Sequence, residues 1–442
     1  MTDRRAVATD IVRRLRTAGH DAYFAGGCVR DQLLGRPPLD FDVATSAAPE
    51  VVRRLFRHTI PVGEQFGVIL VVEGGARFEV ATFRSDDAYV DGRRPSAVHF
   101  GSAREDALRR DFTINALFLD PLTDRVVDLV GGEADLRAGI VRAVGDARAR
   151  IAEDRLRMLR AVRFAARLGF TIEPLTYAAI VAAAPTLTDI AAERIGDEIV
   201  KTLTEGGASR GFELLADTGL LEPVLPEVAH LRGVAQSPDF HPEGDVFVHT
   251  LLLLAQLPSG APETLALGAL LHDVGKPRCV GVHDGRLTFY GHPAVGEAMA
   301  VAICQRLRRS RATWERVAYL VRNHLRLVQA PEMRLSTLKR MLREGGFEEL
   351  LTLAQMDALA SNRDLTYVEF CTRRRAELMQ QDAMRPRSLL AGDDLIALGY
   401  APGPLFGEIL RALEEAQLEG NLHTREEAER FVTTRFARPT DH

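Results

Sequence analysis

The chain has 442 residues, of which 46% are hydrophobic and 26% are charged, and its formal net charge is −5. This composition predicts a folded globular protein of two to four domains. The negative charge argues against nonspecific coating of nucleic acid and leaves only local basic patches for such contacts.

The four cysteines are dispersed and form no CxxC pair, which favours reduced thiols over a disulfide framework or a zinc site. The N-terminus lacks the apolar region of a secretion signal, and the longest apolar stretches are too short to span a bilayer. We therefore expect a cytoplasmic protein without membrane contact. The sequence makes no prediction of the oligomeric state.

A glycine pair near the N-terminus is the first chemical signal. Residues 22–25 are predicted to form a short apolar strand that runs into Gly26 and Gly27, and a short helix follows over residues 29–34. Glycines allow a sharp turn and close approach to a ligand, and the first N–H groups of a helix point outward. Such a turn suits an anion such as a triphosphate.

Two aspartates follow in LDFDVAT, residues 39–45, which has the composition of a strand. Residues two apart on a strand project to one face, so Asp40 and Asp42 are predicted to stand side by side while Phe41 and Val43 point into the core. Adjacent carboxylates repel unless a cation lies between them, and oxygen ligands suit Mg²⁺. A solvent-facing edge strand with two acids is the alternative.

A predicted hairpin, with strands over residues 66–73 and 77–83, carries a further acid, Glu79. This residue is either a third carboxylate that faces the metals or an ordinary exposed strand acid.

GGCVRD, residues 26–31, together with LDFDVAT resembles the catalytic signature of the tRNA nucleotidyltransferase and poly(A) polymerase family, in its bacterial-type (class II) branch. The resemblance implies that Asp40 and Asp42 are catalytic and hold Mg²⁺. It also implies a seat for the triphosphate made by Gly26, Gly27, Arg30 and Asp31.

Residues 85–100, SDDAYVDGRRPSAVHF, are polar and lie between regular elements, so they are predicted to form an active-site loop or a simple connection. In the family, a flexible loop at this point is associated with the switch from C to A addition. The DGRRP stretch resembles the members that carry this loop.

RRDFTINA, residues 109–116, offers guanidinium donors for phosphate or ribose and an acid that can accept from a 2′-hydroxyl. The segment resembles the ribose-recognition motif of the family, which assigns Arg110, Asp111 and Asn115 to the nucleotide. A charged helix start with an aspartate N-cap is the alternative.

A long helical pattern, IAEDRLRMLRAVRFAARLGF, begins at Ile151 and places Asp154 and Arg157, three apart, on one face. Cytosine and adenine each show an amino donor beside a ring-nitrogen acceptor. A carboxylate and a guanidinium therefore match both bases and oppose uracil and guanine. EDRLR resembles the EDxxR template of the family, and the alternative is a plain ion pair within one helix. Arg194, in a segment similar to the ERxxxE motif of the family, is predicted to brace this helix.

A second constellation of metal-ligand residue types lies in the later, helical part of the chain. His249 falls on an apolar helix, and a His-Asp pair ends the next helix. Mixed nitrogen and oxygen ligands of this kind can surround one divalent ion, with enough residues for a second. The ligands are predicted to be His249, His272, Asp273 and Asp357, with His292 and His324 as further candidates. Histidines satisfied in an apolar core are the alternative.

HDVGK, with the earlier histidine, resembles the HD phosphohydrolase superfamily. Some bacterial tRNA nucleotidyltransferases carry such a domain with phosphatase and cyclic phosphodiesterase activity. The resemblance implies a divalent transition metal (nickel, cobalt, manganese or iron) or magnesium at this site. A domain that keeps its ligands without hydrolysing anything is the alternative.

Together these segments predict an α+β chain with a mixed-sheet nucleotidyltransferase head, followed by a helical neck, body and tail that contain an HD domain. The predicted divisions are a head (1–145), a neck with the base-reading segment (146–210), a connector (211–245), an HD domain (246–365) and a tail (366–442). The predicted activity is addition of C and A to the 3′ end of tRNA from CTP and ATP. A poly(A) polymerase or a partial (A-only) enzyme, and an HD phosphohydrolase with an RNA-binding or nucleotide-binding head, are the alternatives.

Overall fold

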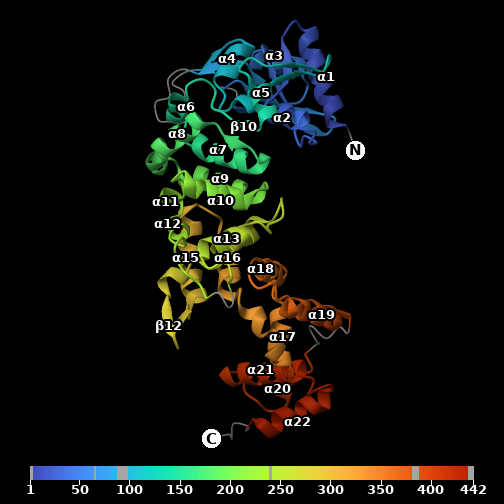
Figure 1. Ribbon diagram of the computed structural model, residues 1–442. Helices are drawn as coiled ribbons and strands as arrows, with labels where there is room; N and C mark the ends of the chain where they lie inside the picture. Colours follow the sequence, from blue (N-terminus) through green and yellow to red (C-terminus); the bar gives the residue numbers. More distant parts are fainter. Residues whose placement is uncertain (1–2, 64–65, 87–97, 238–240, 381–387, 437–442) are drawn as a thin grey trace. The chain divides into compact units, whose positions relative to one another are not determined.

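The computed structural model describes residues 3–63, 66–86, 98–237, 241–380 and 388–436 (Figure 1). It forms two compact units. The first comprises residues 1–230, 257–261 and 306–309, and the second comprises residues 231–256, 262–305 and 310–442. The division at residues 230 and 231 falls inside the predicted connector. The fold is α+β, as the sequence predicts.

The first unit contains a seven-stranded sheet in the order β3-β4-β5-β2-β1-β8-β9. The strands are β1 (Ala22–Ala25), β2 (Asp42–Thr45), β3 (Thr59–Gly63), β4 (Val68–Glu73), β5 (Ala76–Thr82), β8 (Phe118–Asp120) and β9 (Arg125–Val127). Only β2 and β5 run parallel among these neighbours, so the sheet is mixed. The predicted hairpin is present, because β4 and β5 pair across a turn that joins Glu73 to Ala76.

Helices surround this sheet and continue beyond it. They are α1 (Arg4–Thr17), α2 (Gly27–Leu33), α3 (Pro49–Leu55), α4 (Ala103–Leu108), α5 (Gly132–Ala138), α6 (Ala147–Glu153), α7 (Arg157–Leu168), α8 (Pro174–Ala183), α9 (Ala192–Thr204), α10 (Ala208–Asp217), α11 (Leu221–Val224) and α12 (Pro226–Ala229). Two 3₁₀ turns, η2 (Thr113–Asn115) and η3 (Ala184–Asp189), and two short sheets, β6 (Arg84–Asp86) with β7 (Val98–Phe100) and β10 (Ile140–Val141) with β11 (Thr171–Ile172), complete the unit.

Two predicted elements are shorter than the sequence pattern indicates. The strand predicted over residues 39–45 begins only at Asp42. The continuous helix predicted from Ile151 is divided into α6 and α7, because Asp154 has an extended backbone (φ −145°, ψ 103°). The Asp154 side chain accepts from the N–H of Leu156 at 3.1 Å, a local bond that competes with helix continuation. The central part of the loop predicted over residues 85–100 lies outside the described residues.

In its described residues, the second unit consists of helices and the hairpin β12 (Gly281–His283) and β13 (Arg286–Thr288), which the sequence analysis did not predict. Its helices are α13 (Val246–Leu254), α14 (Glu263–Leu271), α15 (His292–Arg306), α16 (Arg311–Asn323), α17 (Leu335–Leu342), α18 (Phe347–Ala360), α19 (Thr366–Gln380), α20 (Gly392–Ala397), α21 (Pro404–Leu418) and α22 (Arg425–Arg435). Two 3₁₀ turns, η4 (Lys276–Arg278) and η5 (Arg326–Glu332), join them.

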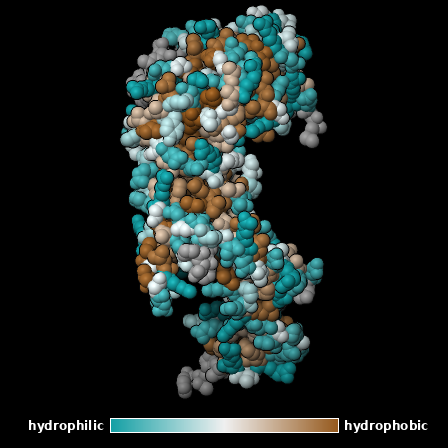
Figure 2. All heavy atoms as spheres, viewed as in Figure 1, coloured by the Kyte–Doolittle hydropathy of each residue, from teal (hydrophilic) through white to brown (hydrophobic). Residues whose placement is uncertain are grey.

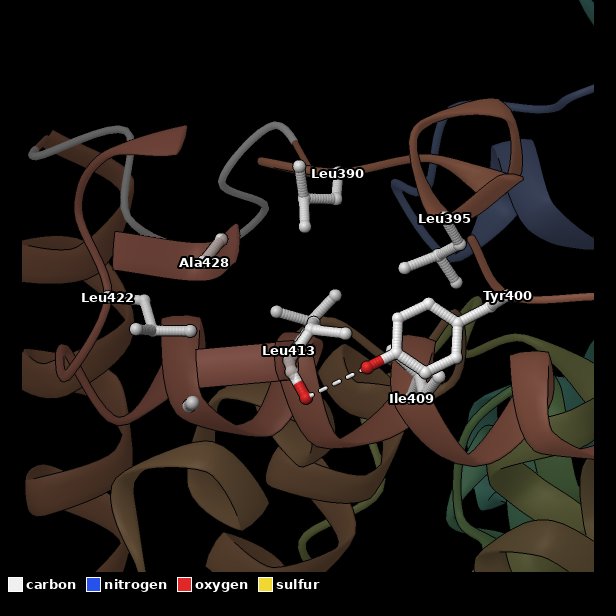
Figure 3. Packing of buried hydrophobic residues seen from close by; sticks show 9 residues of the cluster. Leu390, Leu395, Tyr400, Ile409, Leu413, Leu422 and Ala428 are labelled. Atoms are coloured by element: carbon white, nitrogen blue, oxygen red, sulfur yellow. Dashed lines mark hydrogen bonds between the residues drawn. The ribbon is translucent and has the colours of Figure 1, made fainter. Parts of the chain in front are cut away.

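The last three helices pack around a small core of their own. Leu395, Tyr400, Ile409 and Leu413 are at its centre, and all are almost fully buried (Figure 3). The buried Tyr400 hydroxyl donates to the backbone carbonyl of Val432 at 3.3 Å. Its polar group therefore has a hydrogen-bond partner while its ring packs in the core.

The surface shows no membrane-crossing element within the described part of the chain. Figure 2 shows hydrophilic residues distributed over the visible face, with smaller hydrophobic areas between them. None of the described helices combines the length and the apolar composition that a bilayer crossing needs.

Gly207, which caps α10, allows the close packing of α10 on α7, the helix that carries Arg157. Its φ is +77°, and an added Cβ would lie 2.4 Å from the carbonyl oxygen of Ala166. We predict that Gly207→Ala lowers the free energy of unfolding by about 1–2 kcal/mol for the left-handed backbone and by a further ~1–3 kcal/mol for the overlap. Urea unfolding of the first unit measures the loss.

Gly219→Ala is the matched control, because Gly219 has φ +74° but its nearest neighbour to an added Cβ lies at 3.9 Å. This variant is expected to show the backbone cost alone. Equal losses in both variants would contradict the prediction and show that the α7 backbone moves aside at no cost.

Candidate functional site

A cavity of about 520 Å³ in the first unit brings together the glycine turn, the sheet and the helices that follow it. Its polar and charged lining comprises Gly26, Gly27, Arg30, Asp42, Glu79, Arg84, Arg109, Arg110, Asp111, Asn115, Asp154, Arg157 and Arg160. Among the residues predicted for nucleotide binding and catalysis, only Asp31 and Asp40 are outside this lining.

Asp42 and Glu79 enter the cavity from the two parallel strands. Asp42 directly precedes Val43, and Glu79 directly precedes Val80, and these two valines are register partners. The two carboxylates therefore project on one face of the sheet. Restricted hydration, followed by the negative charges of Glu79 and Asp40, raises the pKa of Asp42 to about 6. A divalent cation would relieve this repulsion.

Asp40 lies outside the strand, so the strand predicted over residues 39–45 is too long and no strand register fixes Asp40 on the face of Asp42. Its carboxylate forms an ion pair with Arg4 at 2.7 Å, and its side chain is 73% exposed. The carboxylate is nevertheless near enough for its charge to raise the pKa of Asp42. Its assignment as a magnesium ligand stays a prediction, whereas Glu79 is the carboxylate that shares the cavity with Asp42.

The glycine turn has a conformation that other residues rarely adopt. Gly26 has φ +73° and ψ −129°, and an added Cβ would lie 3.0 Å from a terminal nitrogen of Arg110. Helix α2 begins directly after it, at Gly27. Because Gly26 has no side chain, it can adopt this backbone conformation and leave room for the guanidinium of Arg110.

Arg30 is buried behind this turn and is fully engaged. Its guanidinium donates to Asn115 Oδ1 at 2.6 Å and to Asp31 Oδ1 at 2.7 and 2.8 Å. Burial lowers the pKa of Arg30 below its ordinary value, while Asp31 opposes this shift. Asp31, which is predicted to help seat a triphosphate, thus lies on the far side of Arg30 and fixes its position.

The segment predicted to recognise ribose is held by three acid–arginine pairs that the sequence analysis did not identify. Asp106, only 1% exposed, accepts from Arg109 at 2.6 Å and from Arg110 at 2.9 Å. Asp111 accepts from Arg160 at 2.6 and 2.8 Å. The spacings of three and four residues from Asp106 to the arginine pair were the available signal.

The predicted template pair lies where α6 ends and α7 begins. Asp154 Oδ2 accepts from Arg194 of α9 at 2.8 Å, the bracing contact predicted for Arg194. Arg157 is the first residue of α7 and donates to the Arg150 carbonyl at 2.6 Å and to Glu153 at 2.5 Å. Asp154 and Arg157 therefore share the cavity, although they do not share the face of one helix.

Six buried or largely buried ligand-type side chains meet in the second unit, from α13, α14, α15, α16 and α18. His249 Nε2 lies 3.0 Å from Asp357 Oδ1 and 3.3 Å from His272 Nε2. His292 Nε2 lies 3.3 Å from Asp273 Oδ1 and 3.2 Å from His324 Nε2. The set forms two ligand groups, His249–His272–Asp357 and Asp273–His292–His324.

Asp273 connects the two groups, because its other oxygen, Oδ2, lies 3.1 Å from His272 Nε2. Burial lowers the pKa of His324 to about 4, which keeps its imidazole neutral, the form that binds a metal. Nitrogen and oxygen ligands in this number fit two divalent ions. The structure thus brings together every residue predicted for this site.

A second cavity, of about 470 Å³, opens beside these ligands. Its charged wall includes Asp273 and Lys276, and its apolar wall includes Leu287, Phe289 and Leu325. Lys276 Nζ donates to Asp273 Oδ2 at 2.7 Å and is buried. A ligand with a negative group and an apolar body would suit this cavity.

Three segments of the chain match family models. Residues 22–142 match the poly(A) polymerase head domain, residues 169–231 the probable RNA- and SrmB-binding site of polymerase A, and residues 246–362 the HD domain. These matches include the glycine turn, the sheet and the histidine cluster, whereas the cavity residues Asp154, Arg157, Arg160 and Phe164 lie between the first two matches.

Known proteins resemble the chain in sequence and fold. The CCA-adding enzyme of Geobacillus stearothermophilus is 49% identical over 223 residues, which span 50% of this chain and 55% of that enzyme. The crystal structure of the Bacillus stearothermophilus CCA-adding enzyme in complex with CTP has a TM-score of 0.73 and 30% identity, with 98% of both chains covered. The CCA-adding enzyme of Levilactobacillus brevis is 34% identical over 423 residues, which span 94% of both chains. This similarity along nearly the whole length shows that the chain belongs to the family of CCA-adding enzymes.

Proposed function

We propose that this protein adds C and A to the 3′ end of tRNA, with CTP and ATP as substrates. The observation that carries the proposal is that carboxylates suited to a metal (Asp42 and Glu79) and a carboxylate–guanidinium pair suited to a base (Asp154 and Arg157) line one cavity. The relatives named for CCA addition support it, and one of them is solved in complex with CTP. We expect the reaction in the cytoplasm.

Asp42, Glu79 and Asp40 would hold magnesium. The metal, when bound, neutralises triphosphate charge and activates the attacking 3′-hydroxyl. The pKa of Asp42 is raised to about 6, so this carboxylate is protonated more easily than an ordinary aspartate, and a bound cation would favour its ionised form. Asp42 is the first residue of β2, and Glu79 lies in the middle of β5. Because sheet strands hold these two carboxylates in place, they would fix where the 3′-hydroxyl and the α-phosphate meet.

The nucleotide sugar and phosphates would lie against the arginine-rich wall. Arg110 is held by Asp106, and Asp111 is held by Arg160 and by Asn115, so each group is fixed before the nucleotide binds. Burial alone would raise the pKa of Asp111, but the Arg160 guanidinium and hydrogen bonds lower it below its ordinary value. Asp111 is therefore a carboxylate that can accept from a ribose hydroxyl.

Asp154 and Arg157 would select the base. Asp154 accepts from an amino hydrogen and Arg157 donates to a ring nitrogen, which suits cytosine and adenine. Uracil and guanine present the opposite order, and each mispaired buried polar group costs about 1–3 kcal/mol. Arg194 restrains the rotation of the Asp154 carboxylate, so the order of donor and acceptor is preserved.

We predict that a tRNA transcript ending at the discriminator base gains three nucleotides with CTP and ATP together, and that Asp42→Asn reduces this rate at least ~10³-fold because one metal ligand is lost. Denaturing gel electrophoresis of the labelled transcript measures both. Continued extension with ATP alone would indicate a poly(A) polymerase, and addition of A only after a supplied CC end would indicate a partial enzyme.

The matched control is Asp21→Asn. Asp21 precedes β1 in the same sheet and lies outside the cavity lining. This variant is expected to extend the transcript. An Asp42→Asn protein that extends at the wild-type rate would overturn the catalytic assignment.

We predict that Asp154→Ala relaxes base selection. Loss of one acceptor worth about 1–3 kcal/mol corresponds to a fall of roughly 5- to 150-fold in the preference for CTP over UTP. The ratio of kcat/KM for the two nucleotides measures it. Asp189→Ala is the control, since Asp189 forms an exposed ion pair with the neighbouring Arg155. An unchanged ratio in Asp154→Ala would refute the base-reading role.

The histidine cluster supports a second candidate function, a metal-dependent phosphohydrolase. The six ligand-type side chains fit two divalent ions, and Lys276 places a positive charge in the adjoining cavity. The metals, when bound, supply a nucleophile from water at neutral pH. Lys276, which is already paired with Asp273 and Gln236, retains one of its three N–H donors for a phosphate oxygen.

We predict that the purified chain hydrolyses 2′,3′-cyclic nucleotides to nucleoside 2′- or 3′-monophosphates when supplied with nickel, cobalt, manganese or magnesium, and that chelation abolishes this hydrolysis. His272→Ala is expected to lower the rate at least ~10²-fold through loss of a ligand. Chromatographic analysis of the products measures it, with Glu344→Ala, whose carboxylate pairs with Tyr319 and Arg326, as the control. Hydrolysis that survives His272→Ala would contradict the assignment.

A further inference from the structure

The histidines of the metal cluster differ in what holds their second ring nitrogen. His272, His292 and His324 each place Nδ1 at 2.8–2.9 Å from the backbone carbonyl three residues earlier, of Ala269, Phe289 and Val321 respectively. A carbonyl acceptor at Nδ1 fixes the tautomer and turns the Nε2 lone pair toward the ions. His272 and His324 are thus oriented by the C-terminal ends of α14 and α16, and His292 by the segment that precedes α15.

His249 lies within α13 and has a carboxylate at the corresponding place. Its Nδ1 is 2.8 Å from Oε1 of Glu243, and the Glu243 side chain is only 5% exposed. Glu243 precedes α13, and the same oxygen lies 2.9 Å from Nδ1 of His241. The other oxygen, Oε2, and Nδ1 of His249 are both buried without a hydrogen bond of good geometry among the described residues, so the contact between Glu243 and His249 is an ion pair by distance.

A buried carboxylate with one unpaired oxygen is costly to maintain, so its position indicates a use. A carboxylate that accepts from Nδ1–H increases the electron density on the ring and strengthens donation from Nε2. Backbone carbonyls cannot do this to the same extent, because they carry no net charge. His249 should therefore be the strongest imidazole donor of the four.

We propose that Glu243 is a positioning residue for metal binding, which orients His249 and strengthens the ion site formed by His249, His272 and Asp357. The inference rests on the proposed metal-binding function of the HD region. The neighbouring site, formed by Asp273, His292 and His324, does not depend on Glu243, because none of its histidines contacts this carboxylate.

His241, Glu243 and His249 also lie close enough to form a ligand group of their own. The chemistry of imidazole favours the positioning role instead. A neutral imidazole has one lone pair and one N–H. When an ion occupies Nε2 of His249, between His272 and Asp357, the proton of this imidazole is left on Nδ1, and the Glu243 carboxylate is the negative group beside it.

The experiment is a calorimetric titration of the chelator-treated full chain with Co²⁺ alone. The wild-type chain is expected to bind in two steps. Glu243→Ala should weaken one step by about 10–100-fold and leave the other unchanged. Glu243→Gln, which keeps a neutral acceptor and nearly the same volume, should recover part of the loss. The thermal unfolding midpoint of the metal-free variants checks that their fold is intact.

His241→Ala and Glu344→Ala are the controls. Glu344 is a carboxylate of the same unit that contacts Tyr319 and Arg326. Both variants should bind Co²⁺ as the wild type does. Wild-type binding by Glu243→Ala would overturn the proposal, as would an equal loss in His241→Ala, which would reveal a separate ion site at His241. A wild-type chain that binds no Co²⁺ would overturn the metal-binding function itself.

Discussion

The parallel register of β2 and β5 is the constraint on which the head depends. This register places Asp42 and Glu79 on one face, where restricted hydration and then the charge of Glu79 raise the pKa of Asp42. A cation between them would relieve this repulsion. The glycine turn, which follows the strand paired with β2, lines the same cavity. In the proposed function, the sheet would therefore position both the metal and the triphosphate before substrate binds.

In the rest of the cavity wall, charged side chains proposed to contact the nucleotide are held by partners of opposite charge. Asp106 fixes Arg110, Arg160 fixes Asp111, and Arg194 fixes the acid at the end of α6. An unpaired charge in this wall would need water or a counterion that a nucleotide must then displace. Pairing within the protein leaves directional donors and acceptors of known order, which is what recognition of a base edge requires.

Local motifs could be predicted from the sequence because the residues that define each of them are only a few positions apart. The hairpin, the arginine-rich segment and the neck motif are of this kind. The predicted strand through Asp40 and the predicted continuous helix through Asp154 are wrong. Hydrophobic periodicity and residue propensity do not show that Asp40 pairs with Arg4 of α1, or that the Asp154 side chain bonds the nearby backbone and competes with the helix. Asp106 could have been identified from its spacing to Arg109 and Arg110, whereas Arg160 was missed because packing sets its partner, Asp111, 49 residues away.

The histidine cluster could be predicted from sequence to the level of its ligands and no further. The order of His and Asp along the chain identifies which residues can bind an ion. It does not identify the groups at Nδ1, which are backbone carbonyls three residues earlier for His272, His292 and His324 and a carboxylate for His249. This difference matters chemically. The head offers oxygen ligands, which suit magnesium, whereas the cluster offers imidazole nitrogens, which favour transition metals. The two sets of ligands would therefore prefer different ions, even when both kinds of metal are present. The Glu243 carboxylate beside His249 would increase this difference in metal preference, because it strengthens a nitrogen ligand and the carboxylates of the head are oxygen ligands.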